Sequence, residues 1–283
     1  MPLAVTCLAA LAPGVLLLAG LAPAAALDRR PWLAGWAALT AFGAAALAAG
    51  GLVLTGPAHT TLGPLGPAVH LDALSATMLL LVAFIGAIVT RFGATYLAGE
   101  AARGRFLRWL CLTLAAVLAL VIAGNLLMLA LAWMATSLTL HHLLVHYRER
   151  PAAHLAARKK FLVSRLGDVA LIAAIALAGG AFGTLDLAAI AEAARAADPA
   201  ATPATHHAFA VLIVLAALLK SAQVPVHGWL TEVMETPTPV SALLHAGIIN
   251  AGGFLIVRLA DLVALSTPPL DILAFVGGFT ALF

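Results

Sequence analysis

The sequence FAVLIVLAALLKSAQVPVHGWL, residues 209–230, places a lysine and a proline within a run that is otherwise mostly apolar. The thirteen uncharged residues 207–219 before Lys220 are too few to cross about 30 Å of hydrocarbon, whereas the segment to Leu230 is long enough. A charged side chain inside a span costs on the order of 3 kcal/mol, so Lys220 is a candidate functional residue. The alternative interpretation is that Lys220 ends the span and extends its amine to the interface.

Pro225 predicts a break in this helix. Proline lacks a backbone N–H, and its ring clashes with the carbonyl four residues back, here that of Ser221. Irregular backbone at membrane depth is tolerated only where it is buried in protein or lines a cavity, as at the ion sites of transporters. The segment therefore predicts a hydrated polar site around Lys220.

The composition of the whole chain is that of a helical membrane protein. Of 283 residues, 63% are hydrophobic and 10% are charged, whereas soluble domains are about a quarter charged. Apolar runs of about 20 residues favour helices, and the lack of a ten-residue alternating pattern argues against a β-barrel. Cys7 and Cys111 lie in apolar runs without CxxC spacing, so we expect them to fill the core. No charge precedes Asp28, so we expect the first segment to be a retained span rather than a signal peptide.

The predicted fold is all-α and polytopic, with about eight complete transmembrane helices and the start of a ninth. We place the spans near 3–26, 33–54, 71–97, 106–124, 126–146, 161–181, 207–230 and 239–260, with a ninth beginning at about 270. The 14 residues that follow Pro269 are too short to cross, so we expect a fragment or a chain completed by a second one. Residues 185–197 space Leu187, Ile190 and Ala194 on one face, which predicts a short amphipathic helix.

Basic residues predict the orientation of the spans, because Lys and Arg in short loops stay on the cytoplasmic side. Twelve of the fifteen lie in alternate connections: Arg29, Arg30, Arg91, Arg103, Arg105, Arg108, Arg148, Arg150, Arg158, Lys159, Lys160 and Arg165. The opposite connections hold only Arg195 and Arg258. We therefore expect the N-terminus outside. Since topology accounts for these charges and the net charge is only +3, we expect no nucleic-acid partner.

Further polar residues follow Lys220. Glu232 and Glu235 precede Pro237, and the apolar helix opened by the prolines carries His245. A histidine can relay protons near neutral pH because its two nitrogens can accept and donate in turn. A buried histidine that only bonds a neighbouring carbonyl is the competing interpretation.

Two more polar sets lie in the fifth and sixth predicted spans. Arg165 and Asp168 are spaced i, i+3, so they can pair on one helix face, either as a structural ion pair or as part of a relay. His141 and His142 face different directions and cannot form an i, i+4 metal site together. His142 and His146 have that spacing, but no nearby carboxylate or thiol completes a site, so we expect no metal in this chain.

Two long motifs resemble a known family. KSAQVPVHGWL (220–230) and ETPTPVSALLH (235–245) closely resemble the signature of the antiporter-like subunits of respiratory complex I and of Mrp-type cation/proton antiporters. RPAA (150–153) and KKFLVSRLGD (159–168) resemble the large distal subunit of complex I. The resemblance covers roughly residues 70–262.

The resemblance implies two inverted five-helix repeats, each with a broken helix that carries a lysine. Residues 1–98 would be an N-terminal three-helix region, 106–262 the first repeat, and 263–283 the start of a truncated second repeat. Carried over by position, Lys220 is the central relay lysine, His245 the next residue of the hydrophilic axis, and Asp168 the acidic residue of the sixth span. Pro225 marks the helix break, and Arg165, Glu232 and Glu235 are assigned to partner docking or to structure.

One position departs from the family pattern. Where the family usually reads Trp-Glu-Gly, this chain has Trp133-Met134-Ala135, so the glutamate that normally pairs with the relay lysine is missing. We expect Asp168, or a histidine of the pair His141 and His142, to replace it. The run ATSLTLHHLL (135–144) resembles a divergent branch, the membrane subunit of DAB-type inorganic carbon transporters.

This branch implies a hetero-complex in a bacterial inner membrane, with a cytoplasmic zinc protein that resembles carbonic anhydrase. The membrane subunit would couple an ion gradient to CO2 hydration; we expect the ion to be the proton, and the sequence leaves sodium open. The chain itself carries no catalytic, cofactor or metal motif, so any zinc is expected in the partner. The alternatives are a pump or antiporter subunit of a complex I or Mrp-type assembly, and a non-conducting scaffold for a soluble enzyme.

Overall fold

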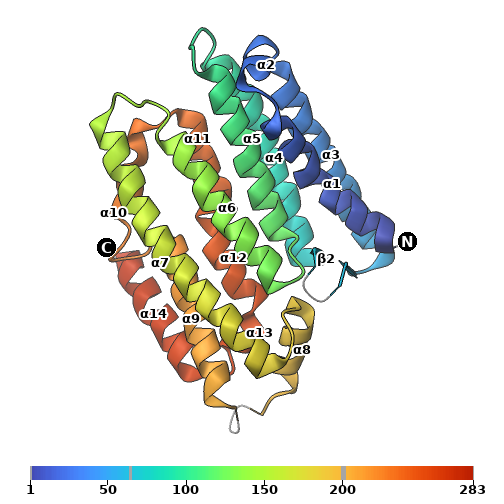
Figure 1. The fold of residues 1–283 in the computed structure, drawn as a ribbon. Coiled ribbons are helices and arrows are strands. Elements are labelled where there is room, and N and C mark those ends of the chain that lie inside the picture. Colours follow the sequence, from blue (N-terminus) through green and yellow to red (C-terminus); the bar gives the residue numbers. More distant parts are fainter. Residues whose placement is uncertain (1, 64–65, 199–201, 283) are drawn as a thin grey trace.

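The computed structural model describes residues 2–63, 66–198 and 202–282, which fold as a bundle of helices (Figure 1). Among these described residues, six helices are long and apolar enough to cross a membrane: α1 (Pro2–Leu21), α3 (Trp32–Thr55), α4 (Ala73–Tyr96), α5 (Arg103–Val121), α6 (Leu126–Leu144) and α7 (Pro151–Phe182). Two shorter apolar helices are α9 (Ala204–Lys220) and α14 (Thr267–Leu282). The chain is thus a multi-pass helical membrane protein, as predicted, and the predicted spans 207–230 and 239–260 are divided into shorter helices.

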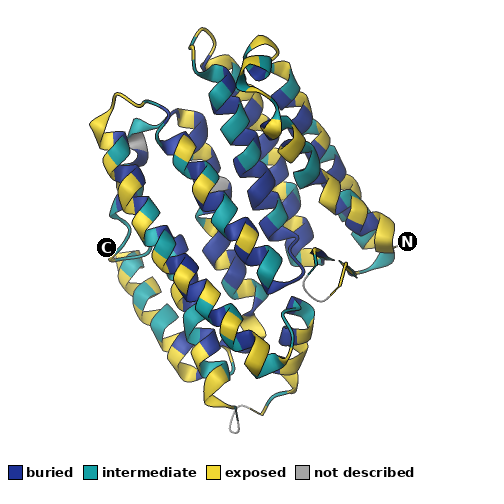
Figure 2. Cartoon of the chain, in the orientation of Figure 1, coloured by how far each residue is buried: buried dark blue, intermediate teal, exposed yellow. Residues whose placement is uncertain are grey.

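The first helices pack through small side chains. The buried face of α3 consists of alanines and one glycine, which lets it approach α1 and α4 closely. The short helix α2 (Ala24–Arg29) links α1 to α3. Helix α5 has the largest buried share of the six long helices, and most of its ribbon in Figure 2 has the dark blue of buried residues.

A small β-hairpin, which was not predicted from the sequence, connects α3 to α4. Strands β1 (Ala58–Thr61) and β2 (Ala68–Leu71) are antiparallel, with Ala58 opposite Leu71. The hairpin lies at the end of the bundle opposite α2 and the start of α7 (Figure 1). The hydroxyls of Thr6 and Thr60 lie 2.9 Å apart, so the first turns of α1 are at the hairpin end.

One helix begins well before its predicted span, and another lies where periodicity predicted it. Helix α7 begins at Pro151, where the sequence placed a span only from residue 161, because a proline at the first position is compatible with a helix and the charged residues that follow do not interrupt it. Helix α8 (Leu187–Ala196) buries Leu187, Ile190 and Ala194, which confirms their common face. The Asp186 side chain caps α8 by accepting bonds from the amides of Ala188 and Ala189.

The helix of the Lys220 segment is interrupted as predicted. Helix α9 ends at Lys220, and irregular backbone that includes Pro225 leads to α10 (Gly228–Thr231) and the 3-10 turn η2 (Val233–Glu235). The next predicted span is also divided, into α11 (Thr238–Leu243), the π-helical turn η3 (Leu244–Ile248) and α12 (Asn250–Arg258), followed by α13 (Ala260–Val263). Lys220 therefore lies at the end of a helix inside the bundle.

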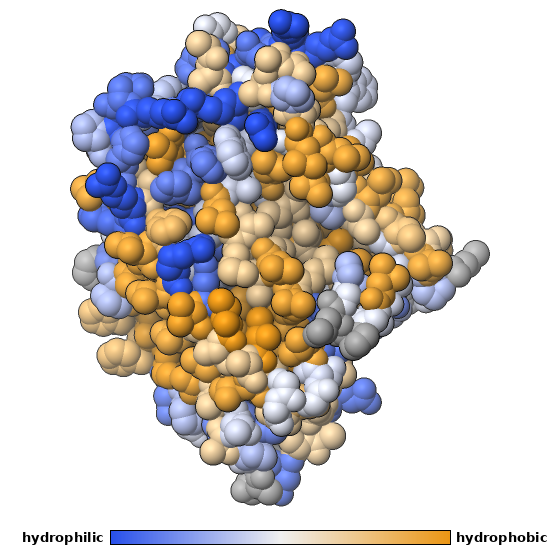
Figure 3. All heavy atoms as spheres, viewed as in Figure 1, coloured by the Kyte–Doolittle hydropathy of each residue, from blue (hydrophilic) through white to orange (hydrophobic). Residues whose placement is uncertain are grey.

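The outer surface matches a membrane environment. Figure 3 shows hydrophobic side chains across the middle of the visible face and hydrophilic ones toward its ends. Large apolar side chains such as Leu18, Leu54 and Phe275 are exposed on the bundle. Apolar surface of this extent is typical of contact with lipid or with other subunits.

Candidate functional site

Lys220 is buried and is held by α6. The residue is only 6% exposed, and its Nζ donates to the Trp133 carbonyl at 3.1 Å and to Thr136 Oγ1 at 2.9 Å. The ammonium also lies 4.6 Å from the centre of the Trp133 ring, within the range of a cation–π contact. Lys220 does not extend to the interface, so the geometry favours the interpretation of a functional charge inside the protein.

A second buried lysine lies beside the first. Lys160 of α7 is 2% exposed, and its Nζ donates to the Ser137 carbonyl at 2.7 Å and to Ser137 Oγ at 2.8 Å. Thr136 and Ser137 are consecutive on α6, so one helix supplies the acceptors of both ammonium groups. Lys160 and Lys220 are close enough to repel each other electrostatically.

An acidic residue faces both lysines. Asp168 of α7 is 4% exposed and interacts electrostatically with Lys160 and Lys220. Arg165 Nη2 lies 2.6 Å from Asp168 Oδ2, which confirms the predicted i, i+3 pairing. We call Lys160, Asp168, Lys220 and the α6 residues Thr136 and Ser137 the lysine axis.

The lysine axis contains no carboxylate hydrogen-bonded to Lys220 among the described residues. A backbone carbonyl and a hydroxyl accept the two bonds that Nζ donates, one turn or less from Met134. Asp168 acts on Lys220 through charge alone. Buried charges need hydrogen-bonding partners, and here neutral acceptors take most of that role.

The two adjacent histidines of α6 point to different neighbours. His141 packs edge-on against Phe161 of α7, with the ring centres 5.6 Å apart, and it interacts electrostatically with Lys160. His142 is exposed and stacks on Trp109 of α5 at 3.8 Å. The structure therefore brings His141, but not His142, to the lysine axis.

His245 is exposed and lies on the π-helical turn η3. Its backbone carbonyl accepts a bond from Asn250 Nδ2 at 3.0 Å, and no bond from its ring to the lysine axis is present among the described residues. The role that the resemblance gives to His245 stays a prediction.

Glu232 and Glu235 attach the segment after the break to the start of α7. Glu232 pairs with Lys159, and Glu235 Oε2 lies 3.2 Å from Arg150 Nη1. Both pairs are solvent-exposed, so each contributes little to stability, about 1 kcal/mol or less. They lie at the basic end of the bundle, which is the end with α2, the start of α7 and the basic connections (Figure 1).

Lys160 was not assigned a site role from the sequence. The positive-inside pattern explained the Lys159-Lys160 pair as loop charges, because the sixth span was expected to begin at residue 161. Helical spacing from Lys160 to Ser164, Gly167 and Asp168 was the signal that could have placed Lys160 on the buried face, and all four are buried in the structure.

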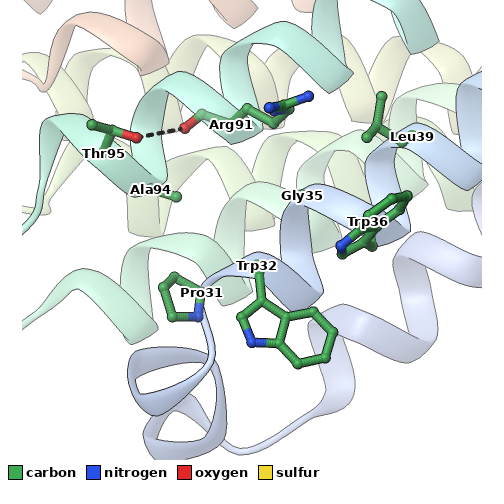
Figure 4. A pocket seen from close by; sticks show the side chains of 8 residues that line it. All are labelled: Pro31, Trp32, Gly35, Trp36, Leu39, Arg91, Ala94 and Thr95. Atoms are coloured by element: carbon green, nitrogen blue, oxygen red, sulfur yellow. Dashed lines mark hydrogen bonds between the residues drawn. The ribbon is translucent and has the colours of Figure 1, made fainter.

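Other cavities lie outside the lysine axis. A shallow pocket of about 330 Å³ between α3 and α4 is lined by Trp32, Trp36 and Arg91, among others (Figure 4). Exposed tryptophans beside an arginine are typical of the membrane interface. Within the described ranges, no group of three or more His, Cys, Asp or Glu side chains is placed to hold a metal ion.

Comparison with protein families gives two matches. Residues 123–283 match the family described as NADH:quinone oxidoreductase/Mrp antiporter, and residues 64–107 match the N-terminal region of complex I chain 5. The chain belongs to this antiporter-like family. Its matched part contains α6, α7 and the broken helix, and therefore the whole lysine axis.

Curated relatives include proteins of both branches considered from the sequence. The chain is 43% identical over 216 residues to the "Probable inorganic carbon transporter subunit DabB" of Hydrogenovibrio crunogenus, covering 76% of this chain and 41% of that protein. It is 39% identical over 254 residues to the DabB2 subunit of Halothiobacillus neapolitanus, covering 87% and 46%. It is 38% identical to NADH-quinone oxidoreductase subunit L of Mycobacterium tuberculosis, covering 76% and 33%. The chain thus spans less than half the length of these relatives.

Solved structures share the fold. A subunit of the Mrp complex from Dietzia sp. superposes with a TM-score of 0.79 at 28% identity, covering 95% of this chain and 29% of that one. A chain of the archaeal membrane-bound sulfane sulfur reductase gives a TM-score of 0.82 at 19% identity, covering 94% and 56%. This second likeness concerns the fold alone.

Proposed function

We propose that the chain is the proton-translocating membrane subunit of an inorganic carbon transporter, with Lys220, Asp168 and Lys160 as its relay. The observation that carries the proposal is the pair of buried lysines held by neighbouring residues of α6, with one carboxylate that interacts with both. A charge is expensive at this depth, so two of them on one axis favour a function in ion movement.

The chemistry of the axis favours protons over sodium. Lysine amines bind and release protons, and an ammonium has three donors and no acceptor. A bound sodium ion would need several oxygen ligands, whereas the oxygens of Thr136 and Ser137 already accept bonds from the lysines. We therefore propose H⁺ as the transported ion.

Repulsion between the lysines supports stepwise transfer. The two amines bind consecutive residues of α6, so an ammonium on Lys220 repels an ammonium on Lys160. Asp168 offsets part of this cost, and Arg165 limits the offset because it pairs with the same carboxylate. When a proton moves from one lysine to the next, the first lysine can therefore accept another proton.

The inorganic carbon branch is supported by two observations. The DabB proteins are among the most similar curated relatives. Met134 stands where the resemblance to the complex I and Mrp subunits implies a glutamate. The proposed partner is a cytoplasmic zinc protein that resembles carbonic anhydrase and uses the proton gradient to accumulate bicarbonate. The exposed ion pairs of Glu232 and Glu235, at the basic end, form part of its proposed docking surface.

The test is bicarbonate uptake by cells that depend on this complex. Uptake should require the chain and the proton gradient, and Lys220→Met should abolish it while the partner still co-purifies. Unchanged uptake would contradict the relay. Co-purification with quinone-reducing or multi-subunit antiporter proteins would favour a pump or antiporter subunit of a complex I or Mrp-type assembly. An intact gradient in liposomes that contain the active complex would favour a scaffold.

A further inference from the structure

A surface cavity of about 320 Å³ lies between α6 and α7. It is lined by His141, Arg158, Phe161 and Leu162. Arg158 and Leu162 are exposed, so the cavity opens at the outside of the bundle. His141 is in the last turn of α6 and Arg158 is in the first turns of α7, which places the cavity toward the basic end.

His141 separates this cavity from the interior. The residue is half-buried, and its Nδ1 is buried without a hydrogen-bond partner among the described residues. The ring lies close to the Ala157 carbonyl and against Phe161. One side of the imidazole therefore meets the cavity, and one ring nitrogen faces the protein.

The interior side of His141 leads to the lysine axis. Ser137 precedes His141 by four residues, so the two side chains share one face of α6. Ser137 accepts both hydrogen bonds of Lys160 Nζ, at 2.7 and 2.8 Å. The cavity, His141, Ser137 and Lys160 are thus consecutive along one path.

We propose that His141 is the group that takes up protons from the basic side and passes them to Lys160, an inference that rests on the proposed function. One ring nitrogen takes a proton from hydronium in the cavity, which becomes water. The other releases its proton to the neutral amine of Lys160, which becomes an ammonium, and the ring returns to its neutral form. A histidine suits this step because its nitrogens can accept and donate in turn.

The charges around His141 favour release of a bound proton. Lys160, His142 and His154 act on the ring electrostatically, and Arg158 lines the cavity. All four are basic, so they favour rapid loss of the proton once it is bound. The proposed path uses His141 only, because His142 stacks on Trp109 on the α5 side.

The test measures proton flux in proteoliposomes that hold the complete complex. His141→Gln should lower the flux by about 100-fold, within the range of general acid–base groups. His142→Gln is the matched comparison and should retain most of the flux. Equal losses, or full flux in His141→Gln, would overturn the proposal.

Chemical rescue distinguishes a role of His141 in proton transfer from a purely structural role. In His141→Ala, added imidazole should restore flux, because the ring fits the vacated volume beside the cavity. Failure of rescue in a variant that still assembles would contradict uptake through His141. Lys220→Met separates the two proposals: if it abolishes flux while His141→Ala does not, only the uptake group is wrong, and if Lys220→Met leaves flux intact, the relay itself is wrong.

Discussion

The ammonium of Lys220 is stabilised by neutral polar groups more than by a neighbouring negative charge. Its two hydrogen-bond acceptors are the Trp133 carbonyl and the Thr136 hydroxyl, and the face of Trp133 adds a cation–π contact. Neutral acceptors can stabilise a protonated amine without forming an ion pair with it. A relay residue must release its proton as well as bind it, so this support suits transfer.

Thr136→Val should impair the relay by removing one acceptor. An unsatisfied buried donor costs about 1–3 kcal/mol, so we expect at least tenfold lower proton flux and a small loss of thermal stability. Thr139→Val is the control, since the Thr139 hydroxyl donates to the carbonyl of Ala135 in its own helix. Similar flux in both variants would contradict the role given to Thr136.

Individual charges could be predicted from the sequence where hydrophobic surroundings made them costly. This applies to Lys220 and to the Arg165–Asp168 pair. From the sequence, Lys160 could not be distinguished from the basic residues of a loop, because α7 is longer than a membrane span needs and begins before the apolar run. Its 32 residues reach about 48 Å, whereas a span needs about 30 Å.

The break after α9 depends on close packing of α12. A methyl group at Gly252 would lie 2.2 Å from Ser221 Oγ and 2.3 Å from the Ala217 carbonyl oxygen, so only glycine fits beside the end of α9. Ser221 Oγ also donates to the Ile249 carbonyl at 3.1 Å. The two helices thus fix the position at which Lys220 ends its helix.

Gly252→Ala should displace this end of α9. Overpacking of this kind costs about 1–3 kcal/mol, so we expect a lower melting temperature and reduced flux. Gly253→Ala is the control because no atom of a neighbouring residue lies within 4 Å of the position that its methyl group would take. Equal melting temperatures for the two variants would show that α12 does not constrain the break.

An ion pair joins the end of α12 to the start of α4. Arg258 Nη1 lies 2.6 Å from Asp72 Oδ2, and Asp72 also caps α4 through the Ser75 amide. Burial alone would raise the pKa of Asp72. The hydrogen bonds with His70, Arg258 and the Ser75 amide, and the charge of Arg258, lower this pKa well below its usual range.

Arg258→Gln should therefore destabilise the protein by about 2 kcal/mol at neutral pH, less than a fully buried pair because Asp72 keeps some contact with water. A carboxyl with a depressed folded pKa contributes stability above its unfolded pKa, about 3.9, and loses it as the pH falls further. The difference from wild type should shrink below about pH 4 in unfolding measurements. Arg195→Gln, which breaks an exposed pair with Asp261, should cost less than about 1 kcal/mol.

Helical segments were more predictable than their interruptions. Apolar length and Pro225 predicted the spans and the break, and periodicity predicted the buried face of α8. The hairpin β1–β2, in contrast, is joined to residues 122–124 by backbone bonds between distant parts of the chain. Such contacts leave no periodic pattern in the local sequence.

The whole molecule has chemically different ends. The basic connections lie at the end with α2 and the start of α7, and the hairpin and α8 lie at the other (Figure 1). Basic loops stay cytoplasmic, so we propose that the hairpin end and the N-terminus face outward. The proposed uptake cavity and docking surface then share the cytoplasmic end.

Cysteine labelling tests this orientation. In a background in which Cys7 and Cys111 are replaced by alanine, Ala196→Cys should react with an impermeant maleimide on intact cells. Glu149→Cys should react only after permeabilisation, because it lies in a basic connection. The reverse pattern would invert the proposed topology.

Proton flux through the reconstituted complete complex, with wild-type Lys220 or Lys220→Met, tests the central claim most directly. The variant should assemble with its partner at wild-type yield, because methionine fills a similar volume without a charge to bury. The account predicts that its flux falls to the level of empty liposomes under the same pH gradient. Wild-type flux in an assembled Lys220→Met complex would contradict it.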